Sequence, residues 1–344
     1  MWMVVREGRL GFRVIVRLVG LVGLLVGLMV GLAGCQEPAP QQPPDAVSVR
    51  LKWVHQAQFA GFYAAAQQGY YAEENLDVTL LPGGGEVDAI DDVVSGVVDF
   101  GVSAPEQILL RRSQGAPIVA IATTYQHNPF VLVSHGDSGI VRPQDLAGHT
   151  LAIGGDTGLL QVEAMMKYLG LDINEVEIVP YTYDTEPFWR GEVDVVPSFM
   201  AGSLLNMTAR EDNLNLIWPG NYGVLFYSDT IIATEETLAE RPDVVLRFLR
   251  ATLRGHEYAV IHPEEAATFS LVYAEASDPD VQLSMSLASI PLINTPDTQI
   301  GEMQEETWQQ MYDILFEQGF LANEVDLSQV YTRQFLNEIY PSSN

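Results

Sequence analysis

Two successive runs of alternating strand and helix patterns restrict the possible folds more than any other feature of the sequence. In each run, short apolar segments typical of strands are separated by segments whose apolar residues follow helical spacing. The expected strands are residues 47–53, 76–81, 99–102 and 118–124 in the first run, and residues 150–153, 176–180, 193–196 and 214–218 in the second. This alternation predicts an α/β fold with two lobes.

The first expected strand contains an unusual set of polar residues. Ser48, Arg50 and Lys52 alternate with apolar neighbours, which is awkward for a strand buried on both faces. We therefore expect one side of this strand to be only partly covered.

The remainder of the sequence returns to the first lobe. After Gly223 come apolar runs at residues 224–227 and 230–233, and then helical patterns only, at residues 242–262, 264–273, 299–318 and 328–339. Chain crossings near residues 130–134 and 224–228 account for this order. The expected lobes, each with a doubly wound sheet, are residues 47–134 with 228–344 (lobe one) and residues 135–227 (lobe two). Such sheets bind ligands beyond the carboxyl ends of their strands.

The amino-terminal segment has the pattern of a secretory signal. Residues 1–17 carry four arginines against one acid, and an apolar run follows at residues 18–31. The sequence LAGC at residues 32–35 resembles the lipobox of bacterial lipoproteins, in which the signal is cleaved before a cysteine that becomes lipid-modified. We expect a signal peptide at residues 1–34, and a lipid anchor on Cys35 with a proline-rich tether at residues 35–46. The body would then lie on the extracytoplasmic face of the cell membrane. The alternative is a transmembrane helix, although the apolar run is short for one.

The charge balance excludes one class of partner. The formal net charge of the chain is −28, and residues 1–34 contribute four arginines and one glutamate, so their removal leaves −31. Such a body repels nucleic acid and anionic lipid. The negative charge does not exclude neutral small molecules as ligands.

Motifs for catalysis and metal binding are absent from the sequence. It contains no G-x-S-x-G, H-E-x-x-H, P-loop or Rossmann glycine pattern. The glycine-rich turns at residues 83–85 and 154–158 lack the P-loop lysine, and Asp156 would repel a phosphate. Cys35 is the only cysteine, and the six histidines show no metal-ligand spacing. We therefore expect no catalytic residue, no metal and no cofactor.

Five short motifs follow one another along the first part of the expected body. They are LKWxxxAQFAGFYxA from residue 51, QGYYxEENLDV from residue 68, GGGEVDA from residue 83, SGVVDFGV from residue 95 and PQDLAGHTLAI from residue 143. Together they resemble the thiamine-pyrimidine-synthase-like branch of the solute-binding proteins of ABC importers, over residues 47–254.

This resemblance implies a type II periplasmic-binding-protein fold. In that fold two lobes, joined by two crossover strands, close on a ligand, and the C-terminal helices lie on lobe one. It also implies an ABC permease and its ATPase as partners. One member of the branch, a eukaryotic synthase, relies on a cysteine-rich motif. Because this chain has no cysteine after Cys35, we do not expect an enzyme.

The first turn separates two possible ligands. Pyrimidine-precursor binders of this branch show W-x-P-N-x-x-H, whereas this chain has WVHQAQF at residues 53–59. Its LKW…AQFAGFY form more closely resembles the riboflavin-binding lipoproteins of bacterial riboflavin importers. We therefore expect riboflavin, or a related neutral heteroaromatic vitamin, with a formyl-aminopyrimidine thiamine precursor as the alternative. A pyrimidine-processing enzyme and a sensor are remote alternatives.

A neutral, flat heteroaromatic ligand calls for aromatic faces and for amide or carboxylate groups at its edge. The absence of arginine near the expected strand ends of the first lobe also favours a neutral ligand over an anionic one. Core packing is an equally good interpretation of any single aromatic residue. The expected ligand-binding residues are Trp53, Gln58, Glu106, Tyr125, Asp156, Thr157, Tyr183, Asp184, Phe199 and Tyr222.

Overall fold

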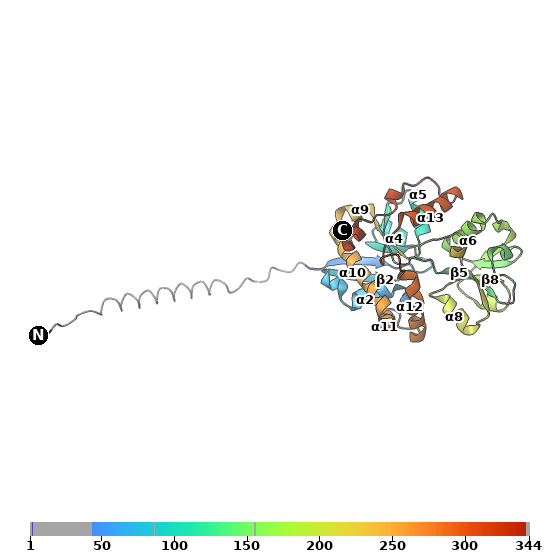
Figure 1. The fold of residues 1–344 in the computed structure, drawn as a ribbon, viewed down its shortest axis with the longest axis horizontal. Helices are drawn as coiled ribbons and strands as arrows, with labels where there is room; N and C mark the ends of the chain where they lie inside the picture. Colours follow the sequence, from blue (N-terminus) through green and yellow to red (C-terminus); the bar gives the residue numbers. More distant parts are fainter. Residues whose placement is uncertain (1, 3–42, 86, 155, 342–344) are drawn as a thin grey trace. The chain divides into compact units, whose positions relative to one another are not determined.

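The computed structural model describes residue 2 and residues 43–85, 87–154 and 156–341. The chain divides into two units, residues 1–43 and 44–344, and the fold described below is that of the second (Figure 1). Apart from Trp2, the expected signal peptide lies outside the described residues, as do Cys35 and most of the expected tether. No helix in the described ranges has the length and apolar character needed to cross a membrane.

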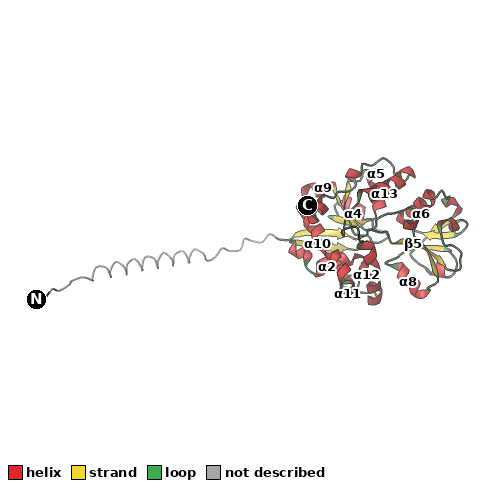
Figure 2. Ribbon diagram, viewed as in Figure 1, coloured by secondary structure: helices red, strands yellow, loops and turns green. Residues whose placement is uncertain are grey.

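Ten strands form two five-stranded mixed sheets, drawn in yellow in Figure 2. Sheet one has the order β2-β1-β3-β10-β4, with β1 (Asp45–Arg50), β2 (Leu76–Leu81), β3 (Phe100–Ser103), β4 (Ile118–Thr123) and β10 (Thr230–Thr234). Sheet two has the order β7-β6-β8-β5-β9, with β5 (Phe130–His135), β6 (Thr150–Ile153), β7 (Glu177–Pro180), β8 (Val195–Phe199) and β9 (Leu214–Ile217).

The two sheets repeat one topology. In each, four strands run in the same direction and one antiparallel strand lies between the third and the last of them: β10 pairs antiparallel with β3 and β4, and β5 pairs antiparallel with β8 and β9. All of β5 belongs to sheet two. Residues 130–134, which we expected in lobe one, therefore pair in the second sheet. The apolar run at residues 224–227 forms no strand.

The first strand confirms the expectation of partial cover. Ser48 and Arg50 are half-buried, and each pairs with an acid beside the strand. The Ser48 N–H donates to Asp99 Oδ2 over 2.8 Å, and the Arg50 Nε donates to Asp92 Oδ2 over 2.7 Å. Strand β1 begins at Asp45, inside the expected tether, and ends at Arg50. Lys52 and Trp53 therefore lie in the loop that follows it.

Helices follow the strands of each sheet. In the first run they are η1 (Ala57–Phe59), α2 (Ala60–Gln67), α3 (Tyr70–Glu73), α4 (Ala89–Val94) and α5 (Pro105–Ser113). In the second run they are η2 (Pro143–Leu146), α6 (Asp156–Tyr168), η3 (Ile173–Glu175), α7 (Glu186–Trp189), α8 (Ser203–Arg210) and η4 (Pro219–Tyr222).

The carboxyl-terminal part is helical, as expected, but contains two helices that the sequence did not predict. Its helices are α9 (Glu235–Glu240), α10 (Pro242–Ile261), α11 (Pro263–Leu271), α12 (Pro279–Ile293), α13 (Glu305–Glu317), η5 (Leu327–Gln329) and α14 (Gln334–Ile339). The unpredicted helices are α9 and α12. The helix expected from residue 299 begins only at Glu305, and the one expected from residue 328 is divided between η5 and α14.

The helices α10 and α11 pack against α2, which places the carboxyl-terminal helices on the first lobe. The approach of α2 to α10 depends on two glycines. A Cβ atom at Gly61 would lie 2.3 Å from the imidazole Cγ of His256, and one at Gly255 would lie 2.2 Å from the Gly61 carbonyl oxygen. Larger residues at either position would force the two helices apart.

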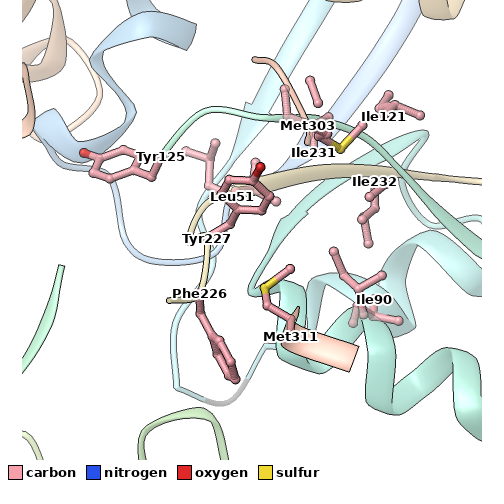
Figure 3. Packing of buried hydrophobic residues seen from close by; sticks show 14 of the residues in the cluster. Leu51, Ile90, Ile121, Tyr125, Phe226, Tyr227, Ile231, Ile232, Met303 and Met311 are labelled. Carbon is pink, nitrogen blue, oxygen red and sulfur yellow. The ribbon is translucent and has the colours of Figure 1, made fainter. Parts of the chain in front are cut away.

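The main hydrophobic core runs through both sheets. The strands β3 and β4 are buried along their whole length, and Phe100 of β3 stacks on Phe248 of α10 with centroids 4.2 Å apart. Figure 3 shows part of this core, in which Leu51, Ile231, Ile232, Met303 and Met311 are labelled. The apolar residues Phe226 and Tyr227 also belong to it, so the run at residues 224–227 fills the core as an irregular segment.

Candidate functional site

The loop after β1 brings a lysine to the carboxyl end of sheet one. Lys52 Nζ forms an ion pair with Asp229 Oδ1 and a hydrogen bond of 3.1 Å to Ser228 Oγ. Both partners immediately precede β10, which lies two strands from β1. The same ammonium lies 5.4 Å from the ring centroid of Phe199, at the end of β8 in sheet two. The lysine therefore joins groups from both sheets.

Gln58 holds the other side of the same aspartate. Its Nε2 donates to Asp229 Oδ2 over 2.7 Å, and its Oε1 accepts from Gln56 Nε2 over 2.6 Å. Asp229 is 1% exposed on its side chain. Buried carboxylates need such partners, so Gln58 acts here as a support for Asp229.

Glu106 lies in the first turn of α5, the helix that follows β3. Pro105 occupies the first turn of α5, where proline favours helix initiation, and this places Glu106 directly after it. The Glu106 side chain is fully buried, and its Oε1 accepts a hydrogen bond of 2.8 Å from Gln161 Nε2 of α6. Its Oε2 has no hydrogen-bond partner among the described residues. Burial raises the pKa of Glu106 to about 7, while the Lys52 charge and the Gln161 hydrogen bond act in the opposite direction.

Two aromatic rings meet above this region from opposite sheets. The centroids of Trp53 and Tyr183 are 5.1 Å apart, and their planes are tilted by 50°. Tyr183 is 55% exposed and has a left-handed backbone, with φ of 61°. Tyr181 extends the aromatic group, since its ring lies 5.5 Å from that of Tyr183. A left-handed backbone such as that of Tyr183 is rare in residues other than glycine.

We call Lys52, Glu106 and Asp229, with their partners Gln58, Gln161 and Ser228, the Lys52 cluster. Three contacts at its edge each join a residue of one lobe to a residue of the other: Lys52 with Phe199, Trp53 with Tyr183, and Glu106 with Gln161. Aromatic faces, buried hydrogen-bonding groups and a boundary between lobes are the usual ingredients of a small-molecule site.

The other expected site residues occupy different environments. Tyr125 is buried, and its hydroxyl donates to Ser289 Oγ over 2.8 Å; burial raises the pKa of this phenol. Asp184 is exposed, and its Oδ1 accepts from the Glu186 N–H at the start of α7. Tyr222 is half-buried in η4 against the main core. Asp156 and Thr157 are the first two residues of α6, the helix that carries Gln161.

Sequence reasoning missed several members of the Lys52 cluster. Lys52 stood out as a polar residue in an expected strand, which is a usable signal. The sequence gives no such signal for Asp229, Ser228 or Gln161. Asp229 is 171 residues from Gln58, and Gln161 is 55 residues from Glu106.

Two other observations concern metal binding and cavities in the described part of the chain. It contains no group of three or more histidine, cysteine, aspartate or glutamate residues placed to hold a metal ion. A cavity of about 300 Å³ lies apart from the Lys52 cluster, and Glu163 and Lys167 of α6 line it together with Gln318 and Phe320.

Comparisons with known proteins give a consistent assignment. The family model described as "NMT1/THI5 like" matches residues 56–266. The chain is 24% identical to the riboflavin-binding protein RibY of Chloroflexus aurantiacus, over 92% of this chain and 96% of that protein. It is 26% identical to a formylaminopyrimidine-binding protein of Halalkalibacterium halodurans, over 89% of this chain and 95% of that protein.

The fold has solved counterparts. The periplasmic aliphatic sulphonate binding protein SsuA of Escherichia coli superposes with a TM-score of 0.65 at 15% identity, covering 83% of this chain and 91% of that one. With the two mixed sheets, this likeness confirms the expected type II periplasmic-binding-protein fold.

Proposed function

We propose that this chain, a member of the NMT1/THI5-like family, is an extracytoplasmic solute-binding protein that delivers riboflavin to an ABC importer. The observation that carries the proposal is the pairing of Trp53 with Tyr183 across the lobe boundary, beside the buried polar groups of the Lys52 cluster. A flat ring system is held by aromatic faces, and its edge is read by hydrogen-bonding groups.

Closing of the two lobes on the ligand would create the form that the permease recognises. Each contact between lobes at the Lys52 cluster would break when the lobes separate, and the ligand would enter where Trp53 and Tyr183 now touch. Within the expected set of ligand-binding residues, we assign direct contact to Trp53, Glu106, Tyr183 and Phe199. Gln58 and Tyr125 act as supports, because their polar atoms bond to Asp229 and Ser289.

Two observations support riboflavin as the ligand, and only the second distinguishes it from a formyl-aminopyrimidine. Similarity to the riboflavin-binding RibY extends over nearly all of both chains, and the first turn lacks the Pro-Asn pair of pyrimidine-precursor binders. A formyl-aminopyrimidine is the second candidate, because a relative of similar identity and coverage binds that compound. We propose no catalytic role, since the sequence after Cys35 has no cysteine for the chemistry of the related synthase.

Membrane attachment is a separate part of the proposal. The LAGC sequence at residues 32–35 supports lipid modification of Cys35, and the proline-rich stretch after it supports a tether. The anchor would keep the receptor close to the permease and the ATPase.

Tryptophan fluorescence distinguishes the two ligands. Riboflavin at micromolar concentration is expected to quench the emission of the purified chain to saturation, because Trp53 would stack on the flavin. Quenching by a formyl-aminopyrimidine without any response to riboflavin would reject riboflavin and keep the receptor role. Conversion of either compound by the purified chain would reject the non-enzymatic assignment.

A further inference from the structure

One polar atom of the Lys52 cluster has no hydrogen-bond partner among the described residues. Glu106 Oε2 is buried, and no described residue donates a hydrogen bond to it. Leaving a buried carboxylate oxygen unpaired is unfavourable, and a bound water, ion or ligand group is one way to satisfy such an atom. The nearby cation does not fill this role, because Lys52 Nζ is held by Asp229 and Ser228.

The charges around this atom define what can bind there. Lys52 is compensated by Asp229, whose second oxygen is held by Gln58. An ionised Glu106 therefore leaves the cluster with an excess negative charge. An anionic group placed beside it would lose its hydration without gaining a free cation. A neutral N–H or O–H group would complete the hydrogen bonding of Glu106.

We propose that Glu106 selects a ligand that donates an N–H or O–H hydrogen bond to its Oε2, and that Asp229 withholds Lys52 from anionic ligands. This inference rests on the proposed function and adds the class of ligand that the site accepts. It explains how a site that contains a half-buried lysine can prefer a neutral vitamin to the phosphate ester of the same vitamin.

Two buried titratable groups near Asp229, namely His256 and Tyr125, stay neutral near physiological pH. Burial lowers the pKa of His256 to about 4, and burial raises the pKa of Tyr125 above its usual range. The charged groups that face Glu106 are Lys52 and, through it, Asp229. Proton uptake by the cluster between pH 8 and pH 6 is therefore assigned to Glu106, whose pKa burial raises to about 7.

The first test measures riboflavin affinity by calorimetry from pH 8 to pH 6. The ionised carboxylate accepts the ligand's hydrogen bond, so affinity should fall about tenfold as its population falls from roughly nine-tenths to one-tenth. The variant Glu106→Gln should show a flat profile, because its amide accepts a hydrogen bond but does not ionise. The matched control Glu236→Gln, on exposed α9, should keep the slope. A flat wild-type profile, or a slope that persists in Glu106→Gln, overturns the role of Glu106.

The second test compares riboflavin with flavin mononucleotide, its phosphate ester, at pH 8. The wild type should bind riboflavin at least about tenfold more tightly, as expected when a charged group meets an uncompensated carboxylate. Asp229→Asn should reduce or reverse this preference, because it frees Lys52. Equal affinities in the wild type, or an unchanged ratio in a folded Asp229→Asn variant, overturn the role of Asp229.

Failure of the proposed ligand gives a different result from failure of this inference. If riboflavin does not bind at any pH, the pH series is repeated with a formyl-aminopyrimidine, whose amino group is also a donor. A slope that is lost in Glu106→Gln would then support the inference and reject riboflavin. Absence of binding by both compounds rejects the proposed function and the inference together.

Discussion

The rings of Trp53 and Tyr183 lie with their centroids 5.1 Å apart, although the two residues belong to loops that leave different sheets. Two rings at this separation touch directly and leave no room for a third ring between them. A stacked ligand must displace at least one of the two rings.

Replacement of Trp53 by alanine should weaken ligand binding by about 1–3 kcal/mol, the range found for a heteroaromatic base stacked on an aromatic residue. Stability should change little, because Trp53 is only half-buried. Calorimetric titration together with a thermal unfolding curve measures both effects. Trp189→Ala is the control, since Trp189 stacks on Arg210 away from the Lys52 cluster. Unchanged affinity with a lower melting temperature would make Trp53 a packing residue only.

At position 183, glycine suits the backbone conformation best, whereas ligand binding needs the tyrosine ring. Because the φ of Tyr183 is 61°, glycine fits the position without the steric penalty of a Cβ atom. We expect Tyr183→Gly to be more stable than Tyr183→Ala by about 1 kcal/mol in urea unfolding. Both variants should lose affinity, since both lack the ring. Equal affinity to wild type in the two variants would remove Tyr183 from the site.

The close approach of α2 to α10 gives a prediction about stability alone. Gly61→Ala should destabilise the protein by about 1–3 kcal/mol in urea unfolding, because the new Cβ atom meets the His256 ring and the core is overpacked. Gly202→Ala is the matched control, since its Cβ atom would be 3.4 Å from the nearest atom, an ordinary contact. A Gly61→Ala variant as stable as the control would contradict the close packing of these helices.

His256 should make folding sensitive to acid. Burial lowers its pKa from 6.5 to about 4. The unfolded chain then binds more protons than the folded one between these values, and stability falls as the pH drops from 6.5 toward 4. The full effect is on the order of 3 kcal/mol. Glu106 acts in the opposite direction: burial raises its pKa from 4.5 to about 7, so its contribution is lost as the pH rises over that range.

Urea unfolding of the wild type and His256→Gln at pH 6.5 and pH 4.5 separates the two contributions. Glu106 is present in both proteins, so the difference between their pH slopes reports His256. The wild type should lose more stability than the variant on acidification. Parallel slopes would mean that His256 is not held neutral by burial.

Cys35→Ser should release the protein from the membrane fraction of a bacterium that processes lipoproteins, because serine cannot carry the thioether-linked lipid. Incorporation of labelled palmitate into the wild type but not into the variant measures the modification directly. If the variant stays with the membranes, another segment holds the protein there.

The alternation of strands and helices predicts the strands of the two runs, because each carries its own apolar run, but it does not assign β5 to sheet two. The apolar run at residues 224–227, where we expect a chain crossing, fills the core without forming a strand. Burial alone produces the same composition as a buried strand. Helix α12 was missed because its apolar residues do not gather on one face and because it contains Pro291.

The candidate site was predictable only for residues that follow strands directly. Trp53, Glu106 and Phe199 stand at strand ends or just beyond them, and topology rules bring such residues to the same edge. Asp229 and Gln161 depend on how β10 and α6 approach residues distant in sequence. Periodicity carries no information about such pairs.

Calorimetric titration of the purified wild-type chain with riboflavin tests the central claim most directly. We predict one saturable site per chain, with a dissociation constant in the micromolar range or below and a negative heat-capacity change from burial of the flavin. Absence of saturable binding at millimolar riboflavin, in protein whose unfolding curve shows that it is folded, would contradict the proposed function.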